Sequence, residues 1–208
     1  MHWPLAFKKT SDYKTLTHED GKPVVDEELS TNHEPTWRAM EALVRKGKTK
    51  AIGVSNFRID QLENLLKFAE IKPACNQVEA HPWFPQTALF NFCRDNGIVL
   101  IAYSPLGSQE GGLHVVKAKL LEDETITAVA KKLGLQPAQV LIAWGIQRGT
   151  VVIPKSSSAA RIKQNFEVSE LPAEDFKLVD EITLRDPSKL MRFVNFDSVW
   201  GVNQFGED

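Results

Sequence analysis

The sequence predicts an α/β fold built on a parallel sheet. Short apolar segments with strand character alternate with segments in which apolar residues recur at helical spacing. The strand segments are almost entirely apolar, which is typical of parallel strands that are buried on both faces. Strands and helices that alternate through short connections indicate right-handed βαβ units. The predicted strands are Thr49–Val54, Ala74–Val78, Ile98–Ala102 and Val151–Ile153.

Proline and glycine mark the ends of the predicted helices. Pro35, Pro137 and Pro172 open helices, because a proline in the first turn removes an N–H that has no partner there. Gly47 and Gly134 follow apolar stripes and suit the residue just after a helix, and Asn96-Gly97 ends a third stripe. The stripes are Trp37, Met40 and Val44; Ile59, Leu62, Leu65, Leu66 and Ala69; Leu89, Phe90 and Cys93; Ile126, Val129, Ala130 and Leu133; Leu141 and Trp144; and Phe176, Val179 and Ile182.

The segment from Lys8 to Glu34 is polar and has no periodicity. It is predicted to be a long surface loop of the kind that covers a binding site. No internal repeat or low-complexity segment divides the chain, and its length is typical of one domain or one large piece of a domain.

Two architectures are compatible with this pattern, an open doubly wound sheet and a barrel. No glycine-rich G-x-G-x-x-G turn follows any predicted strand, which disfavours the dinucleotide-binding open sheet. Polar or aromatic residues instead follow the strands, where barrel enzymes place their chemistry. These residues are Ser55-Asn56, Gln77 to Glu79, Tyr103-Ser104 and Lys155-Ser156.

Composition indicates a globular protein without a polyanionic partner. The 208 residues are 42% hydrophobic and 25% charged, and the net charge is −2. The chain lacks the excess of basic residues that is typical of proteins that bind nucleic acids or membrane surfaces. The N-terminus does not resemble a signal peptide, and no apolar run of about 18 residues predicts a membrane helix. Cys75 and Cys93 are too few for a disulfide framework, so a cytoplasmic location is expected.

Other enzyme classes lack their signatures in this sequence. The histidines other than His2, which are His18, His33, His81 and His114, show no metal-ligand spacing, and no paired cysteines occur at zinc spacing. No Gly-x-Ser-x-Gly elbow indicates a hydrolase. A metal site is therefore not predicted.

Several segments together resemble the aldo-keto reductases, and in particular fungal-type NADP-dependent aldehyde or ketone reductases. They are His2-Trp3-Pro4, Ile52 to Phe57, Asn76 to Pro82, Ala102 to Ser108, and Ile153 to Ser156 with Arg161 and Asn165. They occur in the order of that family and cover nearly the whole chain. The resemblance implies a partial TIM (β/α)8 barrel, roughly strands 4/5 to 8 with their helices.

The resemblance also implies that some catalytic groups are missing. His-Trp-Pro follows the fourth strand in the family but begins this chain, so residues 1–208 are expected to be an N-terminally truncated oxidoreductase domain. The catalytic Asp, Tyr and Lys of the family would precede it. Only His2, which orients the carbonyl oxygen in the family, is present, and the isolated chain is expected to be inactive.

The cofactor implied by the resemblance is NADP(H). Lys155, Ser156 and Arg161 would bind the 2′-phosphate, and Gln164 and Asn165 would bind the adenine. The family often has Glu where this chain has Gln164, which is expected to weaken adenine binding without changing the cofactor. Ser55, Asn56 and Gln77 would bind the nicotinamide carboxamide, Tyr103 would stack on its ring, and Ser104, Leu106 and Ser108 would lie beside the pyrophosphate.

Physical chemistry supports the phosphate assignment. A helix N-terminus presents free N–H groups and a partial positive charge, and a lysine and an arginine add charge-assisted hydrogen bonds. The alternative for Lys155 to Arg161 is a serine-capped helix start with ordinary surface charges. The alternatives for Ser55-Asn56, Gln77 and Tyr103 are a turn, a buried amide and a core tyrosine.

Tryptophans and the C-terminal tail are the candidates for substrate contacts. Trp3, Trp83 and Trp200 would form an apolar substrate wall, although single tryptophans more often belong to a core. The tail from Phe193 to Asp208 resembles the substrate-selecting loop of the family.

The sequence is therefore compatible with two hypotheses about function that belong to different classes. The first is an NADP(H)-dependent oxidoreductase that reduces aldehydes or ketones, for which this chain is the C-terminal part. The second is a non-catalytic NADP(H)-binding or interaction module, and an incomplete gene model is a third possibility. The expected partner is a small carbonyl or alcohol, with self-association through open barrel edges.

Overall fold

The computed structural model describes residues 1–107 and 119–206. The chain divides into two compact units, and each is described by itself. The first unit comprises Met1–Asn76, Asn91–Ile98 and Asn195–Asp208, and the second comprises Gln77–Phe90 and Val99–Val194.

The strands confirm the predicted parallel α/β pattern. They are β1 (Val54–Ser55), β2 (Cys75–Glu79), β3 (Val99–Tyr103) and β4 (Val151–Val152), in the sheet order β1-β2-β3-β4. β3 and β4 are parallel, with Ile101 opposite Val151 and Ala102 opposite Val152. The predicted strand at Thr49 is shorter than expected, because its first residues form no ladder.

In the first unit, the segment predicted to be a long loop has structure of its own. Isolated antiparallel bridges join Phe7 to Val25 and Thr17 to Pro23, and helix α1 (Glu27–Thr31) follows. The side chain of Asp26 caps α1 by accepting a hydrogen bond from the backbone of Leu29. The prediction of a loop without secondary structure was therefore wrong, although most of these residues are exposed as expected.

A buried carboxylate joins the two main helices of the first unit. Helix α2 (Glu34–Arg45) carries Pro35 in its first turn, as predicted, and helix α3 is Ile59–Phe68. Glu41 of α2 accepts hydrogen bonds from the backbone N–H groups of Glu70 and Ile71, at 2.7 and 2.9 Å. Helix α10 (Asp197–Trp200) also belongs to this unit, whereas α4 (Thr87–Asp95) begins in the second unit and ends in the first.

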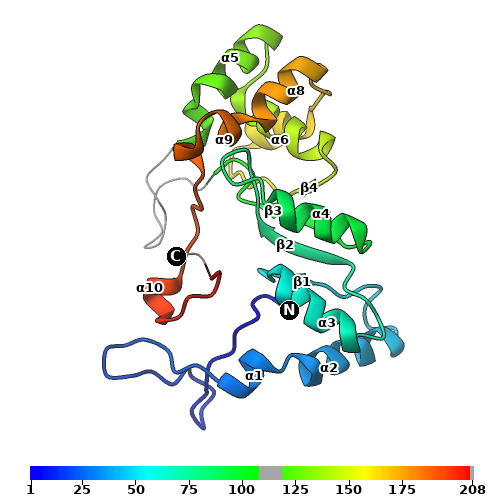
Figure 1. Cartoon of the computed structure of the whole chain (residues 1–208), viewed down its shortest axis with the longest axis vertical. Coiled ribbons are helices and arrows are strands. Elements are labelled where there is room, and N and C mark those ends of the chain that lie inside the picture. Colours follow the sequence, from blue (N-terminus) through cyan, green and yellow to red (C-terminus); the bar gives the residue numbers. More distant parts are fainter. Residues whose placement is uncertain (108–118, 207–208) are drawn as a thin grey trace. The chain divides into compact units, whose positions relative to one another are not determined.

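The second unit contains most of the remaining helices, which surround an apolar core (Figure 1). They are the 3-10 turn η1 (Leu120–Glu122), α5 (Glu124–Leu133), α6 (Pro137–Gln147), α7 (Ala159–Phe166), α8 (Ala173–Asp180), α9 (Ile182–Arg185) and the turn η2 (Pro187–Lys189). Pro137 opens α6, and Gly134 ends α5 with a φ of 67°, as predicted. α6 is buried along six consecutive residues, from Val140 to Gly145.

One predicted helix is divided. The stripe Phe176, Val179 and Ile182 predicted a single helix, but α8 ends at Asp180 and α9 begins at Ile182. Val179 and Ile182 are nevertheless both buried in the core. Periodicity identified the buried face correctly and could not detect the break between the helices.

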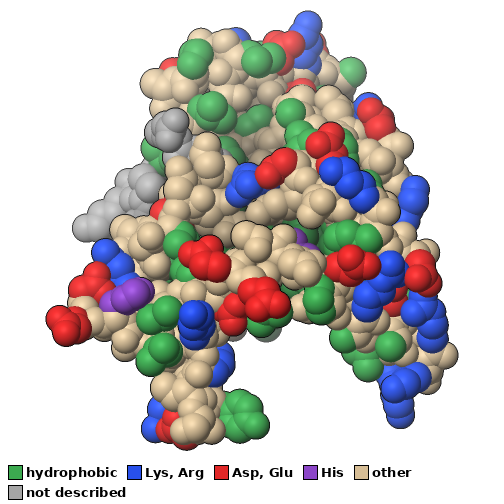
Figure 2. Space-filling model, turned by 60° about the horizontal axis from the view of Figure 1, so that its bottom comes forward, with side chains coloured by type: hydrophobic (Ala, Val, Ile, Leu, Met, Phe, Trp, Pro, Cys, Tyr) green, Lys and Arg blue, Asp and Glu red, His purple; other side chains and the backbone are tan. Residues whose placement is uncertain are grey.

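Acidic and basic side chains lie next to one another on the face shown in Figure 2, in agreement with the small net charge. Among the described residues, no helix is long and apolar enough to cross a membrane. The cytoplasmic location stays a prediction.

Asp123 joins three parts of the second unit. Its carboxylate caps α5 by accepting from the backbone of Thr125 and Ile126, and it also accepts from the indole of Trp83 and the ammonium of Lys189. Burial alone would raise the pKa of Asp123, but the hydrogen bonds from Lys189, from the backbone of Ile126 and from Trp83 lower it below its usual value.

We predict that Asp123→Ala lowers the free energy of unfolding by roughly 2–3 kcal/mol, since a cap and a charged hydrogen bond are lost together. Because the folded-state pKa is depressed, this contribution is present above the unfolded pKa of about 3.9 and is lost as pH falls through the folded value. Urea denaturation at several pH values measures it. Asp186→Ala is the control, because it removes the cap of η2 and a hydrogen bond from the Ser188 hydroxyl but no charged partner. Equal losses for both variants would contradict the prediction.

Self-association also stays a prediction, and one face of β3 and β4 supports it. Val99, Val151 and Ile153 are 46%, 47% and 43% exposed. Exposed apolar strands favour association. We expect sedimentation velocity of the 208-residue chain to show oligomers that Val151→Lys reduces. A monodisperse monomer at all concentrations would contradict this.

Candidate functional site: a cation-lined cavity after β4

The chain passes directly from β4 into the first turn of α7. Ser158 caps this helix by accepting a hydrogen bond from the backbone N–H of Arg161 at 3.5 Å. The N–H groups of the first turn have no partners within a helix, and they carry a partial positive charge. The strand end therefore leads to a helix terminus that attracts anions.

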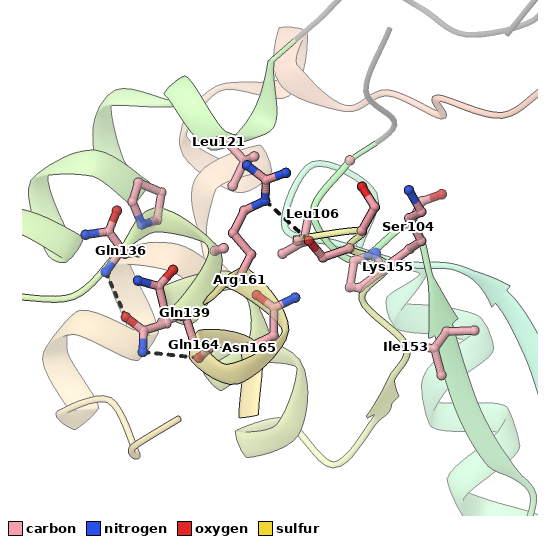
Figure 3. Close-up of a pocket in the computed structure, with 16 residues that line it drawn as sticks. Ser104, Leu106, Leu121, Gln136, Gln139, Ile153, Lys155, Arg161, Gln164 and Asn165 are labelled. Carbon is pink, nitrogen blue, oxygen red and sulfur yellow. Dashed lines mark hydrogen bonds between the residues drawn. The ribbon is translucent and has the colours of Figure 1, made fainter. Parts of the chain in front are cut away.

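The side chain of Ser156 orients Arg161. Its hydroxyl oxygen accepts a hydrogen bond from Nε of Arg161 at 3.3 Å (Figure 3). It also accepts from the backbone N–H of Ser158 at 3.2 Å. Within residues 1–107 and 119–206, neither Lys155 nor Arg161 forms an ion pair with a carboxylate. Both positive charges are thus available to an anion from solution.

These residues line a cavity of about 740 Å³. Its size lies within the range of cofactor and small-molecule sites. The lining residues are 104–107, 121, 136–139, 153, 155–157, 161, 164 and 165. The predicted cofactor residues Ser104, Leu106, Lys155, Ser156, Arg161, Gln164 and Asn165 are therefore brought together, and Ser108 lies outside the described residues.

The loop after β3 forms one wall of this cavity. Gly107 has a φ of 75°, and a Cβ atom on it would lie 3.1 Å from Cβ of Leu120. Both the conformation and the close approach favour glycine at this position. Ser104 also has a positive φ, of 48°. Glycine at position 107 therefore allows the loop to pack closely against Leu120 and Phe193 of the core.

The four predicted nicotinamide residues fall in different units. In the first unit Ser55 ends β1 and Asn56 follows it, with a φ of 62° and a hydrogen bond from its side-chain amide to the carbonyl of His2 at 3.1 Å. Gln77 lies in β2 and Tyr103 ends β3 in the second unit, and both are half-buried. The roles of these four residues toward the nicotinamide stay predictions.

His2 and two of the tryptophans lie in the first unit. The His2 side chain is exposed, and its ring lies 5.8 Å from that of Trp3. Trp3 meets Trp200 edge to face at 4.8 Å, and Phe196 stacks on Trp200 at 4.8 Å. This aromatic cluster joins the start of the chain to the tail.

Trp83 has a different environment, in the second unit. It stacks on Phe193 at 6.1 Å and donates its indole N–H to Asp123 at 3.0 Å. It packs against the apolar core of that unit. Packing against a core was the alternative to a substrate wall, and the substrate role of Trp83 stays a prediction.

Glu79 holds the first residues of the tail. This fully buried carboxylate accepts from the backbone N–H groups of Phe193 and Val194, at 2.5 and 2.8 Å, and its Oε1 lies 2.9 Å from Nε2 of His81. Burial lowers the pKa of His81, although the contact with Glu79 opposes this. The start of the tail is thereby fixed on β2.

Sequence reasoning missed the wall made by the first turn of α6, residues 136–139. Gln136 and Gln139 form a reciprocal capping box at this helix start. The sequence predicted this helix start from Pro137, but nothing local in the sequence indicates that it lies beside α7.

Comparison with known proteins identifies the family. The aldo/keto reductase family profile matches residues 10–184. A glycerol 2-dehydrogenase (NADP(+)) from Hypocrea jecorina is 46% identical over 208 residues, which are 100% of this chain and 64% of that protein. The aldehyde reductase YPR1 of Saccharomyces cerevisiae is 41% identical, over 97% of this chain and 63% of that protein.

The chain belongs to the aldo/keto reductase family. A solved structure of aldose reductase from Giardia lamblia agrees, with a TM-score of 0.85 and 37% identity over 98% of this chain and 66% of that one. This likeness confirms the predicted fold class, a partial (β/α)8 barrel. The chain spans less than two thirds of the length of these aldo/keto reductases.

Proposed function

We propose that this chain is part of an NADP(H)-dependent oxidoreductase that reduces aldehydes or ketones to alcohols. The observation that carries the proposal is the cavity after β4, where Lys155 and Arg161 have no acidic partner among the described residues. The names of the relatives, an NADP(+)-dependent dehydrogenase and an aldehyde reductase, support the same class. The proposed oxidoreductase domain includes all of residues 1–208.

The donor set of the cavity fits the adenosine end of NADP(H). Lys155 and Arg161 would hold the 2′-phosphate, together with the hydroxyl of Ser156 and the N-terminus of α7. Gln164 and Asn165 would meet the adenine with neutral amides. The loop of residues 104–107 lines the same cavity and would offer backbone groups to the pyrophosphate.

In the proposed reaction the bound cofactor supplies a hydride to the carbonyl carbon. Ser55, Asn56 and Gln77 would orient the carboxamide, Tyr103 would cover the ring, and His2 would donate to the carbonyl oxygen. Carbonyl reduction also needs an acid that protonates this oxygen.

The tyrosines of this chain do not suit that acid. Tyr13 is 87% exposed, and Tyr103 has the stacking role. Trp3 and Trp200 would line the substrate side in the first unit. A cofactor-binding module without catalysis is the second candidate, and it would use the same cavity.

We predict that Arg161→Ala weakens NADPH binding about 10- to 100-fold and NADH binding much less, because a charged hydrogen bond contributes about 1.5–3 kcal/mol and only NADPH has the 2′-phosphate. Calorimetric titration of both cofactors measures the difference. Lys163→Ala is the control, since Lys163 lies on the same helix, pairs with Glu167 and does not line the cavity. Equal losses for NADPH and NADH in Arg161→Ala would refute the assignment.

A second prediction separates the enzyme from the module. The 208-residue chain alone is expected to bind NADPH without reducing aldehydes at a normal rate, because general acid catalysis contributes about 10²–10⁴ in rate. Steady-state NADPH oxidation with reactive aldehydes tests this, with and without a separately expressed segment that carries the earlier strands of the barrel. Normal activity of the chain alone would contradict the prediction, and activity that appears only with the added segment would favour the enzyme.

A further inference from the structure

Helix α7 carries the cofactor candidates but is weakly anchored by packing. None of its residues is buried, and its two large apolar side chains, Ile162 and Phe166, are 54% and 93% exposed. A helix of this length is not stable by itself, so tertiary contacts must hold it. With so little apolar burial, hydrogen bonds to a neighbouring element become the main determinants of its position.

Gln139 supplies such hydrogen bonds from the neighbouring helix α6. Its Nε2 donates to the backbone carbonyl of Gln164 at 3.3 Å (Figure 3) and to that of Glu167, the residue that follows α7, at 2.6 Å. The carbonyl of Gln164 also accepts from the backbone N–H of Glu167 at 3.2 Å, so the Gln139 amide adds a second hydrogen bond at this helix end. Its Oε1 accepts from the backbone N–H of Gln136 at 3.0 Å.

The side of α6 that carries Gln139 is firmly held. The six residues that follow it, Val140 to Gly145, are all buried. Gly145 lies so close to β4 that a Cβ on it would be 2.5 Å from Cγ1 of Val152. Gln139 therefore connects a rigid helix to a loosely packed one by both hydrogen atoms of a single amide.

We infer that Gln139 is a positioning residue for NADP(H), which fixes α7 so that Arg161 meets the 2′-phosphate and Gln164 and Asn165 meet the adenine. This inference rests on the proposed function and extends it. Gln139 is not proposed to contact the phosphate. It acts through the backbone of α7. Its loss should therefore lower the affinity for NADPH, whose 2′-phosphate meets Arg161, more than the affinity for NADH.

Two variants isolate the donor. Gln139→Glu keeps an oxygen for the N–H of Gln136 but cannot donate to the two carbonyls. Gln139→Met loses both functions but adds no charge, so an effect shared by both variants comes from the lost donor and not from repulsion. We expect each variant to weaken NADPH binding about tenfold and NADH binding at most about threefold, because this is the size of effect that a hydrogen bond usually contributes.

Gln147→Glu is the matched control on the same helix. Gln147 is also half-buried, donates from Nε2 to the carbonyl of Leu171 at 3.1 Å and accepts from its N–H at 3.0 Å. It does not line the cavity. This variant is expected to lose stability to a similar extent without changing the ratio of NADPH to NADH affinity.

The experiment is calorimetry with NADPH and NADH on the full 208-residue chain, combined with hydrogen exchange of the backbone amides. In both Gln139 variants the amides of α7 are expected to exchange about tenfold faster, while those of residues 140–145 stay protected. Equal losses for the two cofactors, unchanged exchange in α7, or the same change of ratio in Gln147→Glu would each overturn the inference. A wild-type chain without NADPH preference would instead refute the proposed function, and the exchange data would still decide whether Gln139 anchors α7.

Discussion

The short connection between β4 and α7 is the constraint on which the proposed cofactor site depends. Because β4 is parallel to β3, its C-terminal end lies at the same edge of the sheet as the loop of residues 104–107. The chain then enters α7 within a few residues, so Lys155, Ser156 and the helix N-terminus are presented together. Parallel strands followed by helices place polar groups at this edge in many α/β enzymes, and here those groups are cationic.

The second unit combines a rigid part with a loosely packed one. The rigid part comprises α6, whose middle is fully buried, and the Asp123 network that joins η1, α5 and η2. The loosely packed part is α7, which has no buried residue. Ligand-binding elements are commonly drawn from the less stable parts of a fold. Such a helix can adapt to a dinucleotide, but it requires specific polar contacts to keep its cationic side chain in place.

Much of this arrangement could be predicted from sequence. Pro137 and Gly134 gave the correct helix ends, and the polar residues after the apolar strands gave the correct edge of the sheet. The break between α8 and α9 was missed, because Val179 and Ile182 keep helical spacing across it. The contact of Gln139 with residues 164 and 167 was also missed, since hydrogen bonds between distant segments leave no periodic signal. Trp83 shows a related difficulty, because whether a single tryptophan is core or site depends on contacts made far along the chain.

The most direct test of the central claim is the titration of the cofactor phosphates by phosphorus NMR. A phosphate monoester has a second pKa of about 6, and nearby cations stabilise its dianion. When the 208-residue chain binds NADP⁺, we expect the 2′-phosphate signal to shift and the second pKa of this phosphate to fall by roughly one unit or more. Arg161→Ala should reduce this fall. A bound 2′-phosphate that titrates as it does free in solution would contradict the account.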